Sequence, residues 1–139
     1  MEEIKNKSHK FVVPAGKYFL GDPGYTMHGK FWGDVLDSCN YFAEPIGEVE
    51  GHKVLGFKTA YGDGTYWDNF VNKFGVDSGL IGLVPEALIK ITGDEVPLEL
   101  GVWVTFEYPT VCETNGTVLT FGQHRINTGD AEDDEDEEY

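Results

Sequence analysis

Residues 111–122 read VCETNGTVLTFG, and this stretch decides the fold class. Asn115 and Gly116 stand between two β-compatible runs. An Asn-Gly pair in that position is a strong signal for a two-residue hairpin turn, because the favoured turn needs positive φ at both central residues. The pattern predicts an antiparallel hairpin in which Thr114 faces Thr117. We therefore expect this end of the chain to form antiparallel sheet.

A second hairpin signal is the Asp-Gly pair at 63–64, which also lies between β-compatible runs. A two-residue loop there makes Tyr61 face Tyr66. Because side chains alternate along a strand, Tyr66 and Asp68 would share one face with Tyr61, and Trp67 would lie on the other.

The remaining pattern is also mostly β. Apolar runs predict strands at 80–84 and 102–108, and turns recur throughout a chain with 18 glycines. Apolar residues at helical spacing predict one short helix from Phe31 to Cys39, and Pro85 opens a second that Gly93 ends. We expect seven to nine short strands and one or two short helices in a mainly β barrel or sandwich, with an α+β arrangement left open.

The charge is concentrated at one end of the chain. The net charge is −15, and residues 130–139, DAEDDEDEEY, hold eight acids and no base. Residues 1–129 keep 17 acids against 10 bases. These numbers predict a single globular domain over 1–129, with 1–9 as a loose leader and 130–139 as a disordered acidic tail. Because Lys and Arg are not clustered, we expect no direct contact with nucleic acid.

No apolar run approaches the roughly 18 residues of a membrane helix, and residues 1–10 lack the apolar segment of a secretory signal. We therefore expect a cytoplasmic protein without membrane contact. Cys39 and Cys112 are expected to be reduced and partly buried, with a disulfide as the alternative. The four histidines lack metal-ligand spacing and no phosphate-binding loop is present, so we expect neither a metal nor a cofactor.

The candidate site residues are aspartates and aromatics beside glycines. Paired carboxylates serve as general acid and base or bind hard cations, but aspartates also stabilise turns. Aromatic rings with polar groups line ligand pockets, and they equally fill small β cores. Ser78 lacks the context of a nucleophile. The candidate ligand-binding residues are Asp22, Tyr25, Trp32, Tyr61, Asp63, Tyr66, Asp68 and Asp77.

Three segments carry a resemblance to a known family: GKYFLGDPGY at 16–25, TAYGDGTYWDN at 59–69 and FGVDSGLIGLVP at 74–85. Together they resemble a family of small, largely uncharacterised proteins from phages, bacteria and large viruses. Its members carry Y-x-x-GDPCY, a Trp a few residues later, YGDGxY and VDxGxIG. The resemblance spans residues 16–85, half of the chain. It singles out Gly21, Asp22, Pro23, Tyr25, Trp32, Tyr61, Gly62, Asp63, Gly64, Tyr66, Asp77 and Gly79.

The resemblance implies a phage or viral origin, with the host cytoplasm or the virion as the location, and no established activity. Gly24 stands where the family often has Cys, which speaks against a reactive thiol at that position. The resemblance also favours a pocket formed by the three segments over a purely structural role.

We expect a non-catalytic binding or accessory protein that engages a host protein with a basic surface, or a small ligand, through an aromatic, Gly and Asp pocket. The acidic charge would steer a basic partner toward it. The alternatives are a small hydrolase using Asp22, Asp63 or Asp77, an acidic mimic of nucleic acid, and a minor virion component. Whether the chain is an enzyme, and its oligomeric state, stay open.

Overall fold

The computed structural model describes residues 6–27, 29–93 and 95–129. Within them the strands are β1 Asn6–Val13, β2 Gly16–Gly21, β3 Ile46–Val49, β4 His52–Lys58, β5 Gly64–Trp67, β6 Lys73–Val76, β7 Leu80–Pro85, β8 Val102–Phe106, β9 Thr110–Gly116, β10 Val118–Phe121 and β11 His124–Asn127. The helices are α1 Gly29–Ser38 and α2 Glu86–Thr92, and a short 3₁₀ helix, η1, spans Pro23–Thr26. The mainly β prediction is confirmed, with eleven strands in the described residues instead of seven to nine.

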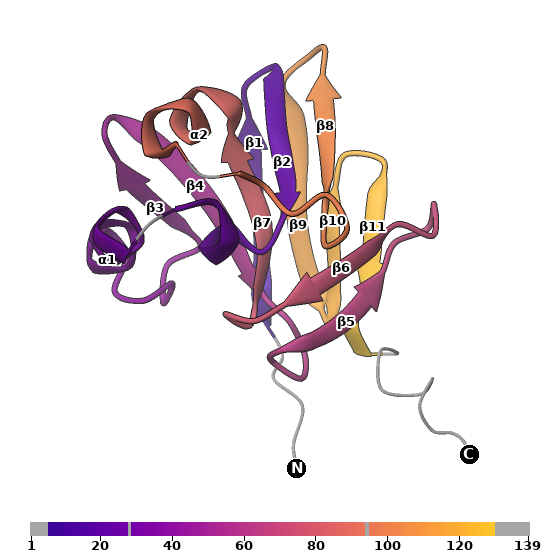
Figure 1. Ribbon diagram of the computed structural model, residues 1–139. Coiled ribbons are helices and arrows are strands. Elements are labelled where there is room, and N and C mark those ends of the chain that lie inside the picture. The colour runs from indigo at the N-terminus through magenta and orange to yellow at the C-terminus, as the bar shows by residue number, and fades with distance from the viewer. Residues whose placement is uncertain (1–5, 28, 94, 130–139) are drawn as a thin grey trace.

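The strands form two large antiparallel sheets and one small one. The four-stranded sheet has the order β1-β9-β10-β11, and the five-stranded sheet has the order β3-β4-β7-β2-β8. Strands β5 and β6 pair with each other and cross one end of the molecule (Figure 1). Helices α1 and α2 lie on the outer side of the five-stranded sheet (Figure 1). The sheets stay open at their edges, so the molecule is a sandwich and not a closed barrel.

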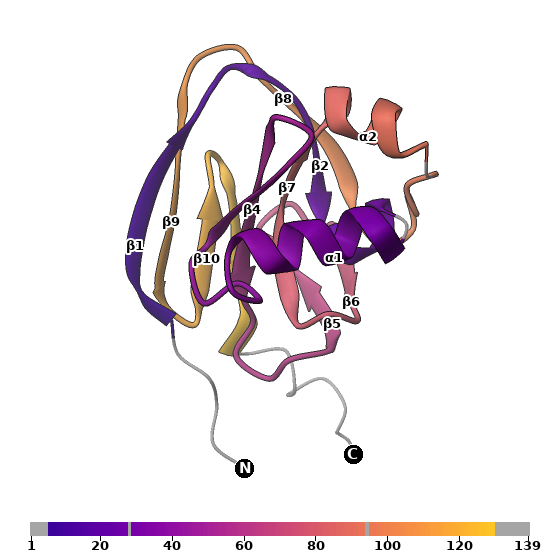
Figure 2. The ribbon, with the colours of Figure 1, turned by 90° about the vertical axis from the view of Figure 1, so that its left-hand side faces the viewer.

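Two pairs of consecutive strands connect the sheets. The chain turns a corner at Pro14 between β1 and β2, and another between β8 and β9. Since β1 pairs with β9 and β2 pairs with β8, the two corners run together over the top of the sandwich (Figure 2). The sheets are therefore joined at this end by a bent ribbon.

Alternation along β2 divides the core into two parts. Tyr18 and Leu20 belong to the inter-sheet core, which fills the space between the large sheets, and Phe19 belongs to the helical core beneath α1 and α2. Successive side chains of a strand point to opposite faces, so a strand covered on both sides has no polar face. The five-stranded sheet is buried in this way, as the burial of four successive residues in β4 and of five in β7 also indicates.

Both predicted helices are confirmed. In α1, Val35 is buried and Phe31, Trp32 and Leu36 pack partly buried against the helical core. Helix α2 follows Pro85 and ends where the N–H of Gly93 donates to the Ile89 carbonyl. No described helix is long and apolar enough to cross a membrane.

The hairpin of β9 and β10 is confirmed, but its turn lies one residue later than predicted. Asn115 pairs with Val118, and Leu119 takes the place opposite Thr114 that was predicted for Thr117. Gly116 has φ +66° and occupies the first central position, as a type II′ turn requires. Pairing shifts by two residues along β10, so every side chain keeps its predicted face.

The hairpin predicted at 63–64 is wrong. Strand β4 pairs with β3 and β7, whereas β5 pairs with β6. Asp63 is not among the described non-glycine residues with positive φ, which the predicted turn requires. Instead, the hydroxyls of Thr59 and Tyr66 donate to the Gly62 carbonyl at 2.5 and 3.0 Å and hold a loop there.

The predicted faces are only partly correct for the same reason. Tyr66 and Asp68 are both buried, and Trp67 is 38% exposed on the other face, as predicted. Tyr61 lies in the loop before β5, and the residue opposite Tyr66 in the strand ladder is Phe74.

The structure tests the prediction for the N-terminal end of the domain but not the prediction for the C-terminal end. Residues 6–9 were expected to be a loose leader, but they are part of β1, and the amide of His9 donates to the Thr114 hydroxyl at 3.2 Å. The pairing partner of β1 is β9, about a hundred residues later, so nothing in the local sequence indicated it. The acidic tail at 130–139 lies outside the described residues.

Candidate functional site

A buried carboxylate connects two of the three sequence segments. Asp22 is fully buried between β2 and η1, and its Oδ1 accepts a hydrogen bond from the Gly24 amide at 2.8 Å. The amides of Asp77 and Ser78 each donate to Oδ2 at 2.7 Å, and the Ser78 hydroxyl donates to Oδ1 at 2.6 Å. We call these four residues the Asp22 junction. Asp22 thereby holds GDPGY against VDSG.

The third segment lies against the same turn. The Thr59 amide donates to the Gly79 carbonyl at 3.0 Å. Gly79 has φ +84°, and a Cβ there would lie 3.7 Å from the Gly62 Cα. A side chain would be strained at this φ, so glycine is the residue that suits the turn. All three segments therefore meet at one place, although they come from three different parts of the chain.

A groove of about 510 Å³ opens beside this meeting point. We call it the motif groove, and its lining comes from α1, the residues that follow it, the end of β4 and the turn before β7: Trp32, Leu36, Tyr41, Lys58, Gly62, Ser78, Gly79 and Leu80. The Trp32 ring stacks on Phe42 with 6.0 Å between centroids. Tyr41 is 66% exposed at its rim. The groove thus combines two aromatic rings with the turn that Asp22 holds.

The carboxylates near the motif groove have different roles. Each oxygen of Asp22 already accepts two hydrogen bonds from the protein, so this group is committed to structure. Asp63 and Asp77 are exposed, and each is adjacent in sequence to a lining residue. These two carboxylates add negative charge at positions next to Gly62 and Ser78, which line the groove. An aromatic groove with negative charge nearby suits a cationic group.

Tyr25 is a half-buried member of the same region. Burial raises the pKa of the Tyr25 hydroxyl, and the negative charges of Asp22 and Asp77 raise it further. The hydroxyl therefore stays protonated at neutral pH and remains a hydrogen-bond donor.

Asp68 forms a separate cluster. Its Oδ1 accepts the amides of Phe70 and Asn72 at 2.9 Å each, and its Oδ2 contacts the Asn72 side-chain amide at 3.0 Å and His124 Nδ1 at 2.9 Å. Burial raises the pKa of Asp68, but the hydrogen bonds from His124 and from Asn72 and Phe70 outweigh it, and the pKa lies below its usual value. This cluster joins the turn after β5 to the hairpin of β10 and β11.

The eight candidate residues therefore do not form one site. Asp22 and Asp77 come together, with Tyr25 close enough to feel both charges. Trp32 is the one candidate among the described lining residues of the motif groove. Tyr66 lies in the inter-sheet core, Asp68 belongs to the separate cluster, and Tyr61 and Asp63 lie in the loop before β5. Sequence reasoning missed Leu36, Tyr41, Lys58 and Leu80 as lining residues.

The described residues hold no group of three or more His, Cys, Asp or Glu side chains that could bind a metal ion. Cys39 and Cys112 are both free and buried, so the alternative of a disulfide is not formed. Burial raises the pKa of Cys112 to about 12, although a hydrogen bond with the Gly122 backbone lowers it somewhat. A thiol that stays protonated is a poor nucleophile, which makes Cys112 a core residue.

Comparison of the chain with protein-family models, with curated proteins and with solved structures finds no match in any of the three.

Proposed function

We propose that the protein is a non-catalytic binding module that holds a Lys or Arg side chain of a partner protein in the motif groove. The observation that carries this proposal is the convergence of three separate sequence segments on one groove with Trp32 and Tyr41 in its walls. Tryptophan and tyrosine are the residues that most often anchor protein interfaces, and arginine is the residue that most often pairs with them.

Charge supports a basic partner. The exposed Asp37, Asp63 and Asp77 each neighbour a lining residue, and Lys58 is the single cation among the eight described lining residues. The net charge of −15 would draw a basic surface toward the protein over long range. The methylene stem of the partner's side chain would cover the rings, and its charged end would reach the carboxylates.

The alternative of an Asp-dependent hydrolase has less support. Such an enzyme needs two carboxylates that face one substrate. Of the three aspartates in this alternative, Asp22 has its oxygens occupied by four hydrogen bonds from protein donors, and Asp63 and Asp77 are both exposed. A phage or viral origin, and with it a host partner or a place in a virion, rests on the resemblance of the three segments alone. A mimic of nucleic acid rests on net charge alone.

Fluorescence anisotropy with a labelled oligo-arginine peptide tests the proposal. Trp32→Ala should weaken binding about tenfold, which corresponds to the loss of one desolvated cation–π contact. Trp67→Ala is the matched control, because Trp67 is exposed outside the motif groove and should leave binding unchanged. Asp77→Asn should weaken binding less, and more visibly at low salt.

Equal binding by the Trp32→Ala and Trp67→Ala variants would contradict the proposal. In that case the peptide would be held by general acidity, including that of residues 130–139, and not by the motif groove.

A further inference from the structure

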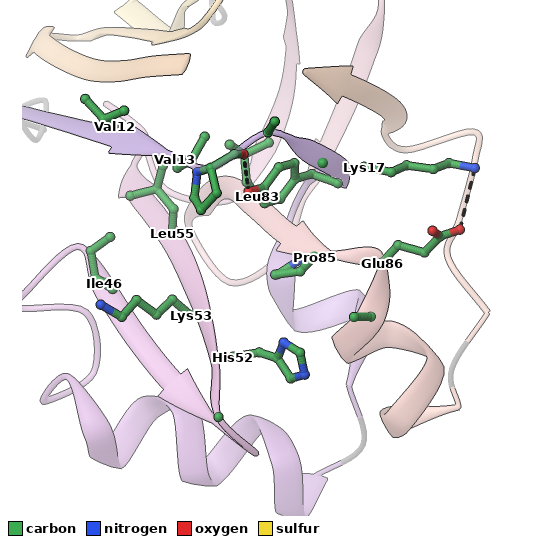
Figure 3. A pocket seen from close by; sticks show the side chains of 16 residues that line it. Val12, Val13, Lys17, Ile46, His52, Lys53, Leu55, Leu83, Pro85 and Glu86 are labelled. Atoms are coloured by element: carbon green, nitrogen blue, oxygen red, sulfur yellow. Dashed lines mark hydrogen bonds and ion pairs between the residues drawn. The ribbon is translucent and has the colours of Figure 1, made fainter. Parts of the chain in front are cut away.

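A second cavity, drawn in Figure 3, shares no lining residue with the motif groove. It opens where the corner between β1 and β2 faces β3, β4 and the beginning of α2, and its volume is about 550 Å³. That volume lies within the range of about 300–1,000 Å³ typical of small-molecule sites. We call it the inter-sheet pocket.

The inner end of the inter-sheet pocket is apolar. Val13, Leu55 and Leu83 form part of its wall, and all three belong to the inter-sheet core. Tyr18 contributes the one hydroxyl near this end, and it donates to the Pro14 carbonyl at 2.7 Å. A group that enters here therefore finds carbon surface that continues the core, and an apolar body is the chemistry that fits.

The rim of the inter-sheet pocket carries two lysines and one acid. Lys17, His52 and Lys53 line it, with Glu86 as the acid. Lys17 points away from the hollow to its ion pair with Glu86 at 3.6 Å (Figure 3), and it also lies over the Trp103 ring at 4.8 Å. This pair neutralises one cation and the acid.

His52 and Lys53 remain at the rim as the first two residues of β4. Neither forms an ion pair within the described part of the chain. Glu48 pairs with Lys53 in the ladder of β3 and β4, so its carboxylate reduces the field at the rim without binding the ammonium group.

We propose that the inter-sheet pocket binds a small amphipathic carboxylate. The apolar body would lie against Leu55 and Leu83, and the carboxylate would lie at the rim beside the ammonium group of Lys53, which is on the same face of β4 as Leu55. This site would select an anion, whereas the motif groove would select a cation. In a chain with 25 acids and 10 bases, an exposed anion-binding site requires a local cation, and Lys53 supplies it, because Glu86 neutralises Lys17.

Isothermal titration calorimetry with three probes of equal chain length tests this proposal: decanoate, decanol and decyltrimethylammonium. Decanoate should bind at one site, more tightly than decanol, and the ammonium compound should bind least. Methyl NMR should show the largest shifts at Leu55 and Leu83. Binding of the ammonium compound as tight as that of decanoate, or shifts confined to other residues, would overturn the proposal.

Variants then separate the head group from the body. Lys53→Gln should weaken decanoate about 3- to 10-fold and leave decanol unchanged, because only the charged head loses a partner. Lys73→Gln is the matched control, since Lys73 is exposed on β6 outside the lining. Glu48→Gln should strengthen decanoate binding. If Lys53→Gln binds decanoate as tightly as the Lys73→Gln control, the carboxylate does not lie at this rim and the proposal fails.

A variant that fills the cavity tests the location of the body. Ile46→Trp places a large ring at the half-buried edge of the inter-sheet pocket and should abolish binding of both decanoate and decanol. Undiminished binding by a folded Ile46→Trp protein would overturn the proposal. If the Ile46→Trp variant does not fold, the Lys53→Gln variant tests the proposal on its own. Trp32→Ala should leave decanoate binding unchanged, so this test is independent of the motif groove.

Discussion

Asp22 and Asp68 are two buried aspartates that solve the same physical problem differently. Each accepts four hydrogen bonds from protein donors, which compensates for the loss of water around a charged group. Two of the residues that donate to Asp22 lie 55 and 56 positions away in sequence. Most donors to Asp68 lie within four residues of it, and His124 is the distant one.

The difference shows what each carboxylate does for the molecule. Asp22 joins two turns from distant parts of the chain and has no ionic partner among the described residues, so its removal would release the wall of the motif groove. Asp68 shapes its own turn and adds a histidine that can carry positive charge. We therefore expect the loss of Asp22 to lower the free energy of unfolding more than the loss of Asp68. The effect of losing Asp68 should depend on pH.

The largest expected effect is that of Asp22→Ala. Removal of the carboxylate leaves the amides of Gly24, Asp77 and Ser78 without their acceptor in a partly buried place, which should lower the free energy of unfolding by about 3–4 kcal/mol. Urea denaturation measures this change. Asp63→Ala is the control, because that exposed aspartate should change stability by less than about 0.5 kcal/mol. If Asp22→Ala and Asp63→Ala lowered the free energy of unfolding by similar amounts, Asp22 would contribute no more to stability than an exposed aspartate.

Asp68→Asn should have an intermediate effect that depends on pH. The pKa of Asp68 is lower in the folded protein than in the unfolded chain, so its contribution is fully present above the unfolded value of about 3.9 and is lost as pH falls through the folded value. At neutral pH the variant should lose about 2 kcal/mol of unfolding free energy. Urea denaturation at several pH values should show wild type and variant converging under acid conditions. A difference independent of pH would show that the charge of Asp68 contributes nothing.

The smallest effect should come from Ser78→Ala. This change removes one of the four donors to Asp22 and keeps the Ser78 amide in place, so the loss should be about 1 kcal/mol. Urea denaturation measures this loss. The double variant with Asp22→Ala gives the interaction energy between the Ser78 hydroxyl and the Asp22 carboxylate. A Ser78→Ala effect that persists unchanged in the Asp22→Ala background would show that the hydroxyl does not act through Asp22.

Elements with strong local signals were predictable. Val35 and its neighbours specified α1, and Gly93 marked the end of α2 with φ +75°. The hairpin at 63–64 failed because the hydroxyls of Thr59 and Tyr66 compete for the backbone of the turn, and propensity does not describe such contacts. The first half of β1, residues 6–9, was taken for a loose leader because its pairing energy comes from residues at the other end of the chain.

The candidate site was predictable only in part. The Asp22 motif was identified, but its role followed from bonds to a turn more than fifty residues away. His124 carried no sequence signal, since its partner Asp68 lies in another segment. The inter-sheet pocket also had none, because its wall combines a corner, a strand edge and a helix start that meet only in three dimensions.

The pairing of β1 with β9 has a consequence for how the chain folds. His9 bonds with Thr114 across 105 positions, so the first strand has no partner until nearly all of residues 1–116 have been synthesised. Closing so long a loop carries an entropic cost before any contact compensates for it, and chains rich in such contacts typically fold in milliseconds to seconds. On the ribosome, β1 would wait as an unpaired strand for its partner. The sandwich would therefore be completed as a late step, after β9 has become available.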